Sequence, residues 1–246
     1  MPIRSTIRRT YPHARPRHEA FADVLDSLVR HHDIDLERVL MATSICADEA
    51  NDHSLHEMSY VRRNAPDFML DTFNLGGLAG FPFTGVMGMT AFAQHVPDHG
   101  AALIVYGPHI GVTDDGDFGV MQRWGQVKLS AACGSLMAAV HNLDHDDDVV
   151  ADADSYQQDM VRHALFPHRN EILHAANPLL AATEIAYRLI DAQLRSYVRA
   201  AASAFTCRHI ALWGGLFINT GSSFDTYIDE RTFEVFDVAD LTGSAA

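Results

Sequence analysis

Residues 39–45 have the sequence VLMATSI, a short and mostly apolar run that ends directly before Cys46. Such a run is typical of a parallel strand that is buried on both faces. The run AALIVYG at residues 101–107 has the same character, and His109 lies just past its end. Because ligands of open α/β sheets bind outside the carboxyl ends of the strands, Cys46 and His109 are better placed for chemistry than residues in mid-strand.

Apolar residues at helical spacing surround these strands along the chain. We expect helices near residues 20–32, 86–96, 136–143, 155–164 and 178–205. We expect further strand material at residues 210–213 and 217–218, and an edge strand at residues 232–238. This order of elements predicts an α/β fold class, with a largely parallel central sheet covered by helices.

The length and composition predict a single domain over residues 1–246. The 246 residues, of which 48% are hydrophobic, suffice for one sizeable core and contain no linker or internal repeat. Residues 1–17 carry five arginines and are expected to form a flexible N-terminal arm, because no apolar region follows them as it would in a secretory signal. A transit peptide stays an alternative for this short basic segment.

The charge limits which partners the protein can bind, and the cysteine content indicates its compartment. The net charge of −14 argues against binding to nucleic acid or to an anionic membrane, because both depend on Lys and Arg. No apolar run approaches the roughly 20 residues that a membrane-spanning helix needs. Three cysteines are too few for a secreted disulfide framework, so we expect a reducing compartment, the cytoplasm.

Cys133 is the third candidate ligand. It precedes the helix expected near residues 136–143, and the amide groups at a helix N-terminus favour a thiolate. With Cys46 and His109 it supplies two thiolates and one imidazole, and catalytic zinc sites have three protein ligands and an open fourth position. The set predicts metal-assisted hydration or hydrolysis, although each residue alone is more often part of the core.

Two other interpretations of the sequence stay open. The glycine-rich segment at residues 74–85 lacks the Lys-Ser or Lys-Thr pair of a phosphate loop, so its Leu78, Phe81 and Phe83 suit a small apolar pocket or the core better than a nucleotide site. Glu49 would be the general base of a zinc hydrolase or deaminase. Deaminases, however, hold two cysteines close together in sequence, whereas here they are far apart.

Five motifs follow one another in the middle of the chain. They are CADE at residues 46–49, GGLAGFPFTG at 76–85, HVP at 95–97, YGPHIG at 106–111 and CG at 133–134. In these motifs the chain resembles the limiting-CO2-inducible protein B family, which is similar to β-class carbonic anhydrases and is also grouped with the theta class. The resemblance spans residues 39–141 and leaves the C-terminal part of the chain without support.

The resemblance implies an α/β fold of β-carbonic-anhydrase type, a homodimer, and a Zn²⁺ ion held by Cys46, His109 and Cys133. The implied activity is that of a zinc lyase, a carbonic anhydrase that hydrates CO2 reversibly to bicarbonate by zinc-bound hydroxide. Enzymes of the β class carry a catalytic Asp-Arg dyad two and four residues after the first cysteine. Asp48 matches this pattern, whereas the arginine position is taken by Ala50.

The missing arginine leaves two outcomes for the site. Arg123, Arg62 or Arg63 would have to supply the guanidinium, and Arg123 is preferred because it lies between the second and third ligands in sequence. With an arginine partner Asp48 would orient the reacting water, and without one it would bind zinc itself and close the site. The alternative function is therefore a catalytically inactive zinc-containing homologue that acts as a bicarbonate-sensing or assembly protein.

Two smaller expectations concern residues outside the ligand set. His53 and His95 are the histidines closest in sequence to the motifs, so they are the first candidates for releasing protons near neutral pH. Cys207 has no motif around it and is expected in the core.

Overall fold

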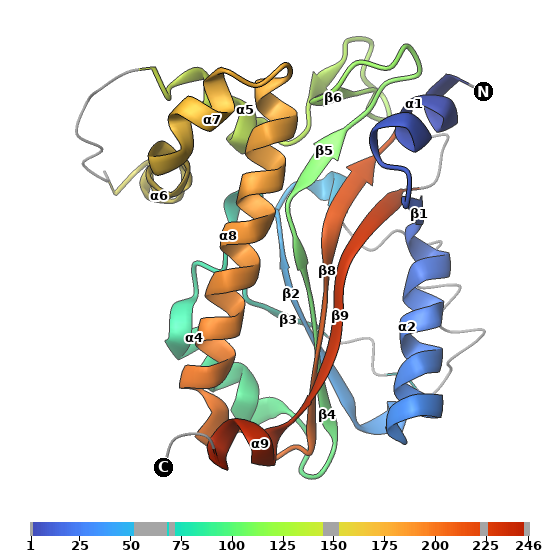
Figure 1. Cartoon of the computed structure of the whole chain (residues 1–246), viewed down its shortest axis with the longest axis vertical. Coiled ribbons are helices and arrows are strands. Elements are labelled where there is room, and N and C mark those ends of the chain that lie inside the picture. The colour runs from blue at the N-terminus through green and yellow to red at the C-terminus, as the bar shows by residue number, and fades with distance from the viewer. Residues whose placement is uncertain (1, 52–67, 69–71, 145–152, 222–225, 244–246) are drawn as a thin grey trace.

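The computed structural model describes residues 2–51, 68, 72–144, 153–221 and 226–243, and its centre is a twisted sheet (Figure 1). Neighbouring strands follow the order β1-β9-β8-β4-β2-β3, and β5 also pairs with β8. The strands of this sheet are β1 (Arg15–Pro16), β2 (Val39–Ile45), β3 (Thr72–Asn74), β4 (Ala101–Gly107), β5 (His109–Gly111), β8 (His209–Asn219) and β9 (Tyr227–Asp237). A separate two-stranded sheet pairs β6 (Val120–Met121) with β7 (Ser130–Ala131).

The predicted α/β architecture is confirmed. Strands β2, β3, β4, β5 and β8 pair in parallel, while β9 is antiparallel to β8 and β1 is antiparallel to β9. The helices are α1 (Pro2–Thr10), α2 (Arg17–His32), α4 (Gly85–His95), α5 (Gly134–His141), α6 (Tyr156–Leu165), α7 (Arg169–Leu173), α8 (Pro178–Ala200) and α9 (Val238–Gly243). In the described part of the chain, no helix has both the length and the apolar character to cross a bilayer.

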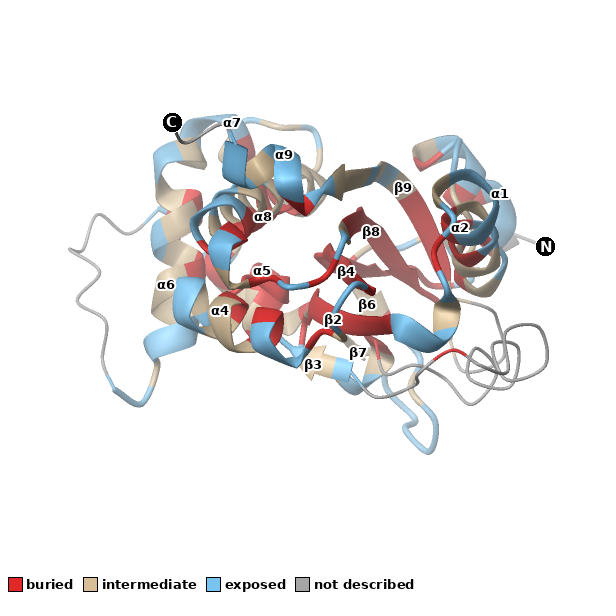
Figure 2. Cartoon of the chain, turned by 90° about the horizontal axis from the view of Figure 1, so that it is seen from below, coloured by how far each residue is buried: buried red, intermediate tan, exposed pale blue. Residues whose placement is uncertain are grey.

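Helices cover both faces of the sheet, and a core lies on each side (Figures 1 and 2). Helices α4 to α8 cover one face, where Phe92, Leu136 and Ile190 are buried against the even-numbered residues of β4. Helix α2 covers the other face and buries Leu28 there, against the odd-numbered residues of the same strand. A strand buried on both faces must be apolar throughout, which explains its sequence AALIVYG. The single-domain organisation stays a prediction.

Two strand predictions need adjustment. Residues 210–213 and 217–218 are parts of one strand, β8, whose pairing with β9 shifts register between Gly214 and Gly215. The predicted edge strand at residues 232–238 is the second half of β9, which begins already at Tyr227. Strand β1 pairs with β9 only at Tyr227 and Ile228, so the rest of β9 lies at the edge of the sheet as expected.

The expectation of a flexible N-terminal arm is wrong for residues 2–10. They form helix α1, whose Ile3 and Ile7 are each 1% exposed and pack in the core together with Tyr11. Ile3 and Ile7 are four residues apart and so share one face of the helix, and Tyr11 continues this spacing directly after its end. The arginines occupy the exposed face, and their number obscured the apolar side of a short amphipathic helix.

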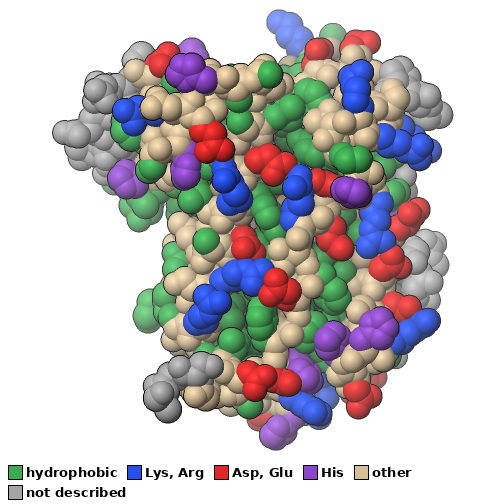
Figure 3. All heavy atoms as spheres, viewed as in Figure 1, with side chains coloured by type: hydrophobic (Ala, Val, Ile, Leu, Met, Phe, Trp, Pro, Cys, Tyr) green, Lys and Arg blue, Asp and Glu red, His purple; other side chains and the backbone are tan. Residues whose placement is uncertain are grey.

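Charged side chains on the face formed by α8 and β9 are interleaved in sign (Figure 3). Arg195 of α8 binds both carboxylate oxygens of Glu234 on β9, and Arg231 of β9 pairs with Glu184 of α8. These pairs connect the long helix to the outer part of the sheet. Each of these pairs is neutral, so the acidic groups that give the net charge of −14 lie outside them.

Gly107 sets the position of His109 at the end of β4. Its φ is +146°, and a Cβ atom built on it would lie 1.9 Å from the carbonyl oxygen of Gly215 in the neighbouring strand. Any side chain would therefore force β4 and β8 apart at the point where the chain crosses to β5. Glycine is required here for both conformation and space.

We predict that Gly107→Ala lowers the free energy of unfolding by about 3 kcal/mol or more, because it combines an unfavourable φ with a backbone clash. The matched control is Gly85→Ala, since Gly85 also has a positive φ, +64°, but has no atom within 4 Å of the added Cβ. The control should lose only about 1 kcal/mol. Equal losses in urea-induced unfolding of the two variants would contradict the close approach of β4 and β8.

Candidate metal centre

The three predicted ligands come together at the carboxyl ends of the parallel strands. Cys46 follows β2, His109 begins β5, and Cys133 precedes the first turn of α5. Their ligand atoms all lie within 4.8 Å of one another, and the two sulfur atoms are 3.7 Å apart. All three side chains are buried. Residues up to 87 positions apart in sequence therefore form one cluster.

The donor set fits a tetrahedral metal ion. Two thiolates bound to zinc at about 2.3 Å with tetrahedral angles lie about 3.8 Å apart, close to the 3.7 Å between the sulfurs of Cys46 and Cys133. The Nε2 atom of His109 is buried without a hydrogen-bond partner within the described part of the chain. A buried polar atom of this kind needs a partner, and a cation next to the two sulfurs would supply it.

The two thiols differ in how readily they ionise. The hydrogen bond from Cys133 lowers the pKa of Cys46 to about 4 against the effect of burial, and His109 adds to this lowering. The same interaction raises the pKa of Cys133 well above its usual value, and burial raises it further. The amides of Ser135 and Leu136 at the start of α5 favour a Cys133 thiolate, as expected, but they are outweighed. Binding of a cation would therefore release the Cys133 proton.

Asp48 and Arg123 form a two-point ion pair beside the cluster. Both oxygens of Asp48 accept hydrogen bonds of 2.9 Å, one from each terminal nitrogen of Arg123. The Oδ2 atom of Asp48 lies 3.8 Å from the Nε2 atom of His109. The preferred guanidinium donor thus pairs with Asp48, while Arg62 and Arg63 lie outside the described residues. Ala50, in place of the local arginine, donates its backbone N–H to Asp48 at 3.0 Å.

The hairpin formed by β6 and β7 holds Arg123 in place. Its Nε donates to the hydroxyl of Ser130 at 2.7 Å, and a terminal nitrogen donates to the carbonyl of Ala131 at 2.8 Å. Burial raises the pKa of Asp48, but the hydrogen bonds from Arg123 and from Ala50 outweigh it and lower the pKa to about 2. The carboxylate is therefore ionised and fixed in orientation throughout the neutral range.

Glu49 does not point into the cluster as a general base would. Its side chain is 72% exposed and pairs with Arg123 from the solvent side. The deaminase interpretation, which relied on Glu49, loses its support.

His95, the candidate proton carrier that lies among the described residues, does not reach the site. His95 ends α4 and its ring packs against Phe73, which pairs with Ala42 four residues before Cys46. About 13 Å of strand separates this contact from the cluster. His53 lies outside the described residues.

The glycine-rich segment packs beside Cys46 and has no free amides for phosphate at its centre. The N–H of Ala79 donates to the sulfur of Cys46 at 3.3 Å, and those of Gly77 and Gly80 donate to carbonyls of the same segment. A Cβ on Gly76 would come within 2.9 Å of backbone atoms of β2, so the segment lies directly on this strand. Phe81 is 2% exposed and belongs to the core.

Asn219 is a residue of the site that the sequence does not indicate. It is the last residue of β8, is 1% exposed, and its Oδ1 atom lies 2.6 Å from the Nδ1 atom of His109. Its Nδ2 atom donates to the carbonyl of Ala50 at 2.7 Å. The partner is 110 residues away in sequence, and an asparagine at the end of an apolar strand carries no local signal of this contact.

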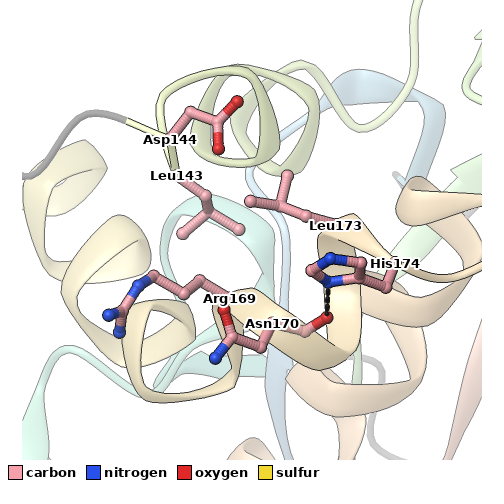
Figure 4. Close-up of a pocket in the computed structure, with 6 residues that line it drawn as sticks. All are labelled: Leu143, Asp144, Arg169, Asn170, Leu173 and His174. Carbon is pink, nitrogen blue, oxygen red and sulfur yellow. Dashed lines mark hydrogen bonds between the residues drawn. The ribbon is translucent and has the colours of Figure 1, made fainter.

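A separate cavity of about 370 Å³ lies between the end of α5 and α7 (Figure 4). Leu143 and Leu173 point into it, and the His174 ring is hydrogen-bonded to the backbone of Asn170. The guanidinium of Arg169 lies 4.6 Å from the Phe166 ring. None of the residues lining this cavity belongs to the metal cluster, and its polar groups do not converge on one point.

Several solved structures are similar to the chain. The crystal structure of PtLCIB4, a homolog of the limiting CO2-inducible protein LCIB, has a TM-score of 0.82 at 26% identity, with 96% of each chain covered. A point mutant of PtLCIB4 has a TM-score of 0.76 at the same identity and the same coverage. LCIB itself has a TM-score of 0.64 at 16% identity, with 94% of this chain and 96% of that chain covered, which shows the shared fold.

The comparison with curated protein sequences gives no match. The sequence model of one family, limiting CO2-inducible proteins B/C beta carbonic anhydrases, matches residues 17–237. This range includes the three candidate ligands, the Asp48–Arg123 pair and Asn219. The chain therefore belongs to the family of limiting CO2-inducible proteins B/C beta carbonic anhydrases.

Proposed function

We propose that the chain is a zinc-dependent carbonic anhydrase, which hydrates CO2 reversibly to bicarbonate. The observation that carries the proposal is the Cys46, His109 and Cys133 cluster with an arginine-bound Asp48 at its side. The three residues would hold the ion, and Asp48 and Arg123 would act on the reacting water. Zinc held by three protein ligands lowers the pKa of a water in the fourth position and so makes hydroxide available near neutral pH.

Asp48 would orient the reacting water. Each carboxylate oxygen has two acceptor positions, and Arg123 takes one of them on each oxygen. The remaining position on Oδ2, the oxygen nearest to His109, is left to accept a hydrogen bond from the water. A fixed acceptor of this kind aims the oxygen lone pairs of the water at the incoming CO2.

Arg123 would keep the site open. Two parallel hydrogen bonds fix a carboxylate more firmly than a single charge does, so Asp48 resists turning inward to become a fourth ligand. Taken alone, the absence of an arginine at position 50 indicates the inactive homologue. The contact with Arg123 instead supports the active enzyme.

CO2 carries no charge and needs a small apolar binding place. The glycine-rich segment offers Leu78 and Phe83, which are partly buried, next to Ala79, whose N–H reaches Cys46. We propose that these side chains line the approach to the reacting water.

We further propose a cytoplasmic homodimer. All three cysteines are free, which suits a reducing compartment. Trp124 and Val127 on the hairpin that carries Arg123 are 89% and 98% exposed, an apolar surface suited to burial between two subunits.

Light scattering should give twice the chain mass of 27.1 kDa, and a monomer at micromolar concentration would contradict the dimer.

We predict that purified protein binds one zinc per chain and that Cys46→Ser, His109→Ala and Cys133→Ser each lose most of it. The matched control is Cys207→Ser, because Cys207 is also buried but lies outside the cluster and contacts the carbonyl of His209. Elemental analysis after dialysis against a weak chelator gives the stoichiometry. Unchanged zinc in the three ligand variants, or loss of zinc in the control, would refute the assignment of the site.

We predict that Arg123→Ala lowers the rate of CO2 hydration at least about 100-fold while zinc stays bound, because Asp48 loses both of its guanidinium contacts. Arg123→Lys should recover only part of the rate, since a single ammonium cannot make two parallel hydrogen bonds. Arg188→Ala removes a surface pair with Glu171 and should leave the rate unchanged.

A stopped-flow CO2 hydration assay on fully metallated protein measures these rates. Wild type with no rate above buffer from mildly acidic to alkaline pH would refute the enzyme and leave the inactive zinc homologue. An Arg123→Ala rate within a few-fold of wild type would refute the proposed role of the Asp48–Arg123 pair but not the enzyme activity.

A further inference from the structure

Asn219 contacts both His109 and the turn that follows Asp48. Its side-chain oxygen lies 2.6 Å from Nδ1 of His109, and its side-chain nitrogen lies 2.7 Å from the carbonyl oxygen of Ala50. Ala50 belongs to the short turn that follows Asp48 and also binds that carboxylate. One buried side chain therefore contacts a metal ligand on one side and the turn beside the catalytic carboxylate on the other.

The partners of the Asn219 amide fix the position of the proton on His109. The carbonyl of Ala50 can only accept, so the NH₂ group of Asn219 must face it. The amide oxygen then faces His109 and can only accept, so Nδ1 of the neutral ring must carry the proton. Nε2 is left with a bare lone pair, and this is the atom that is buried without a hydrogen-bond partner among the described residues.

The backbone of the sheet holds Asn219 in this position. Strand β8 pairs in parallel with β5, and His109 is in register with Phe217, two residues before Asn219. Residues two apart on a strand project to the same face, so the Asn219 side chain reaches His109 diagonally. The N–H of Val112 donates to the backbone carbonyl of Asn219 at 2.9 Å and fixes the end of the strand.

We propose that Asn219 is a positioning residue. It holds His109 in the tautomer that presents the Nε2 lone pair to the metal, and its hydrogen bond to Ala50 fixes the turn next to Asp48. The inference rests on the metal centre of the proposed function, but not on CO2 hydration. In the other tautomer Nε2 would carry a hydrogen and could not bind a cation. Partners that orient a metal-bound histidine typically change metal affinity about 10- to 100-fold.

The test compares two variants that differ in whether residue 219 can accept a hydrogen bond from Nδ1 of His109. Asn219→Leu removes the acceptor for the Nδ1 proton, whereas Asn219→Asp keeps an acceptor of the same size, replaces the donor to Ala50 with an oxygen, and adds a negative charge. We expect the leucine variant to bind zinc about 10- to 100-fold more weakly in competition with a chromophoric chelator. The aspartate variant should keep most of the affinity, which a purely structural role of Asn219 would not predict.

Nitrogen-15 spectra of histidine-labelled, metal-free protein measure the tautomer directly, at a pH well above the usual imidazole pKa of about 6.5. The His109 signal is assigned by its loss in His109→Ala. We expect the proton on Nδ1 in wild type and in Asn219→Asp, and a mixture of tautomers in Asn219→Leu. A proton on Nε2 in wild type would overturn the proposal even if the leucine variant failed to fold.

The control for lost stability is Asn177→Ala. Asn177 caps α8 by accepting from the amides of Leu179 and Leu180, away from the metal cluster. Its loss should lower the melting temperature without changing zinc affinity. Unchanged affinity in Asn219→Leu, or equal weakening in both Asn219 variants, would overturn the proposal. Wild type that binds zinc without hydrating CO2 would refute only the proposed function.

Discussion

Two thiols and an imidazole buried side by side destabilise a fold unless something compensates them, and the rest of the site is arranged around this constraint. The two sulfurs are 3.7 Å apart, and a histidine nitrogen faces them without a partner among the described residues. A divalent cation would satisfy all three groups at once. The sheet makes the arrangement possible, because parallel strands bring residues that are distant in sequence to one edge.

The residues around the ligands do not follow the sequence order expected for a β-class enzyme. Ala50 stands where a local arginine would be, and the guanidinium comes from Arg123, which is 75 residues from Asp48 in the chain. Ala50 still contributes, because its backbone N–H binds Asp48 and its carbonyl binds Asn219. The turn after Cys46 is thus held by backbone contacts, and the charge is supplied from the β6–β7 hairpin.

The sequence predicts the centre of the molecule well and its periphery less well. Strands β2 and β4 are continuous apolar runs, and their ends give the first two candidate ligands, because burial on both faces leaves a strong local signal. Helix α1 is missed because its core residues Ile3 and Ile7 are hidden in a basic segment of only 9 residues. Arg123 is indicated as the partner of Asp48 only by its place between the second and third candidate ligands, and the contact of Asn219 with His109 depends on long-range packing, for which a single sequence carries no local pattern.

The central claim is that two sulfurs and one imidazole nitrogen surround a single zinc ion and leave one position for solvent. X-ray absorption at the zinc edge of the purified, zinc-loaded protein tests it most directly. The account predicts two sulfur neighbours at about 2.3 Å and two lighter neighbours, nitrogen or oxygen, at about 2.0 to 2.1 Å. A first coordination shell with fewer than two sulfurs, or with a third, would contradict it.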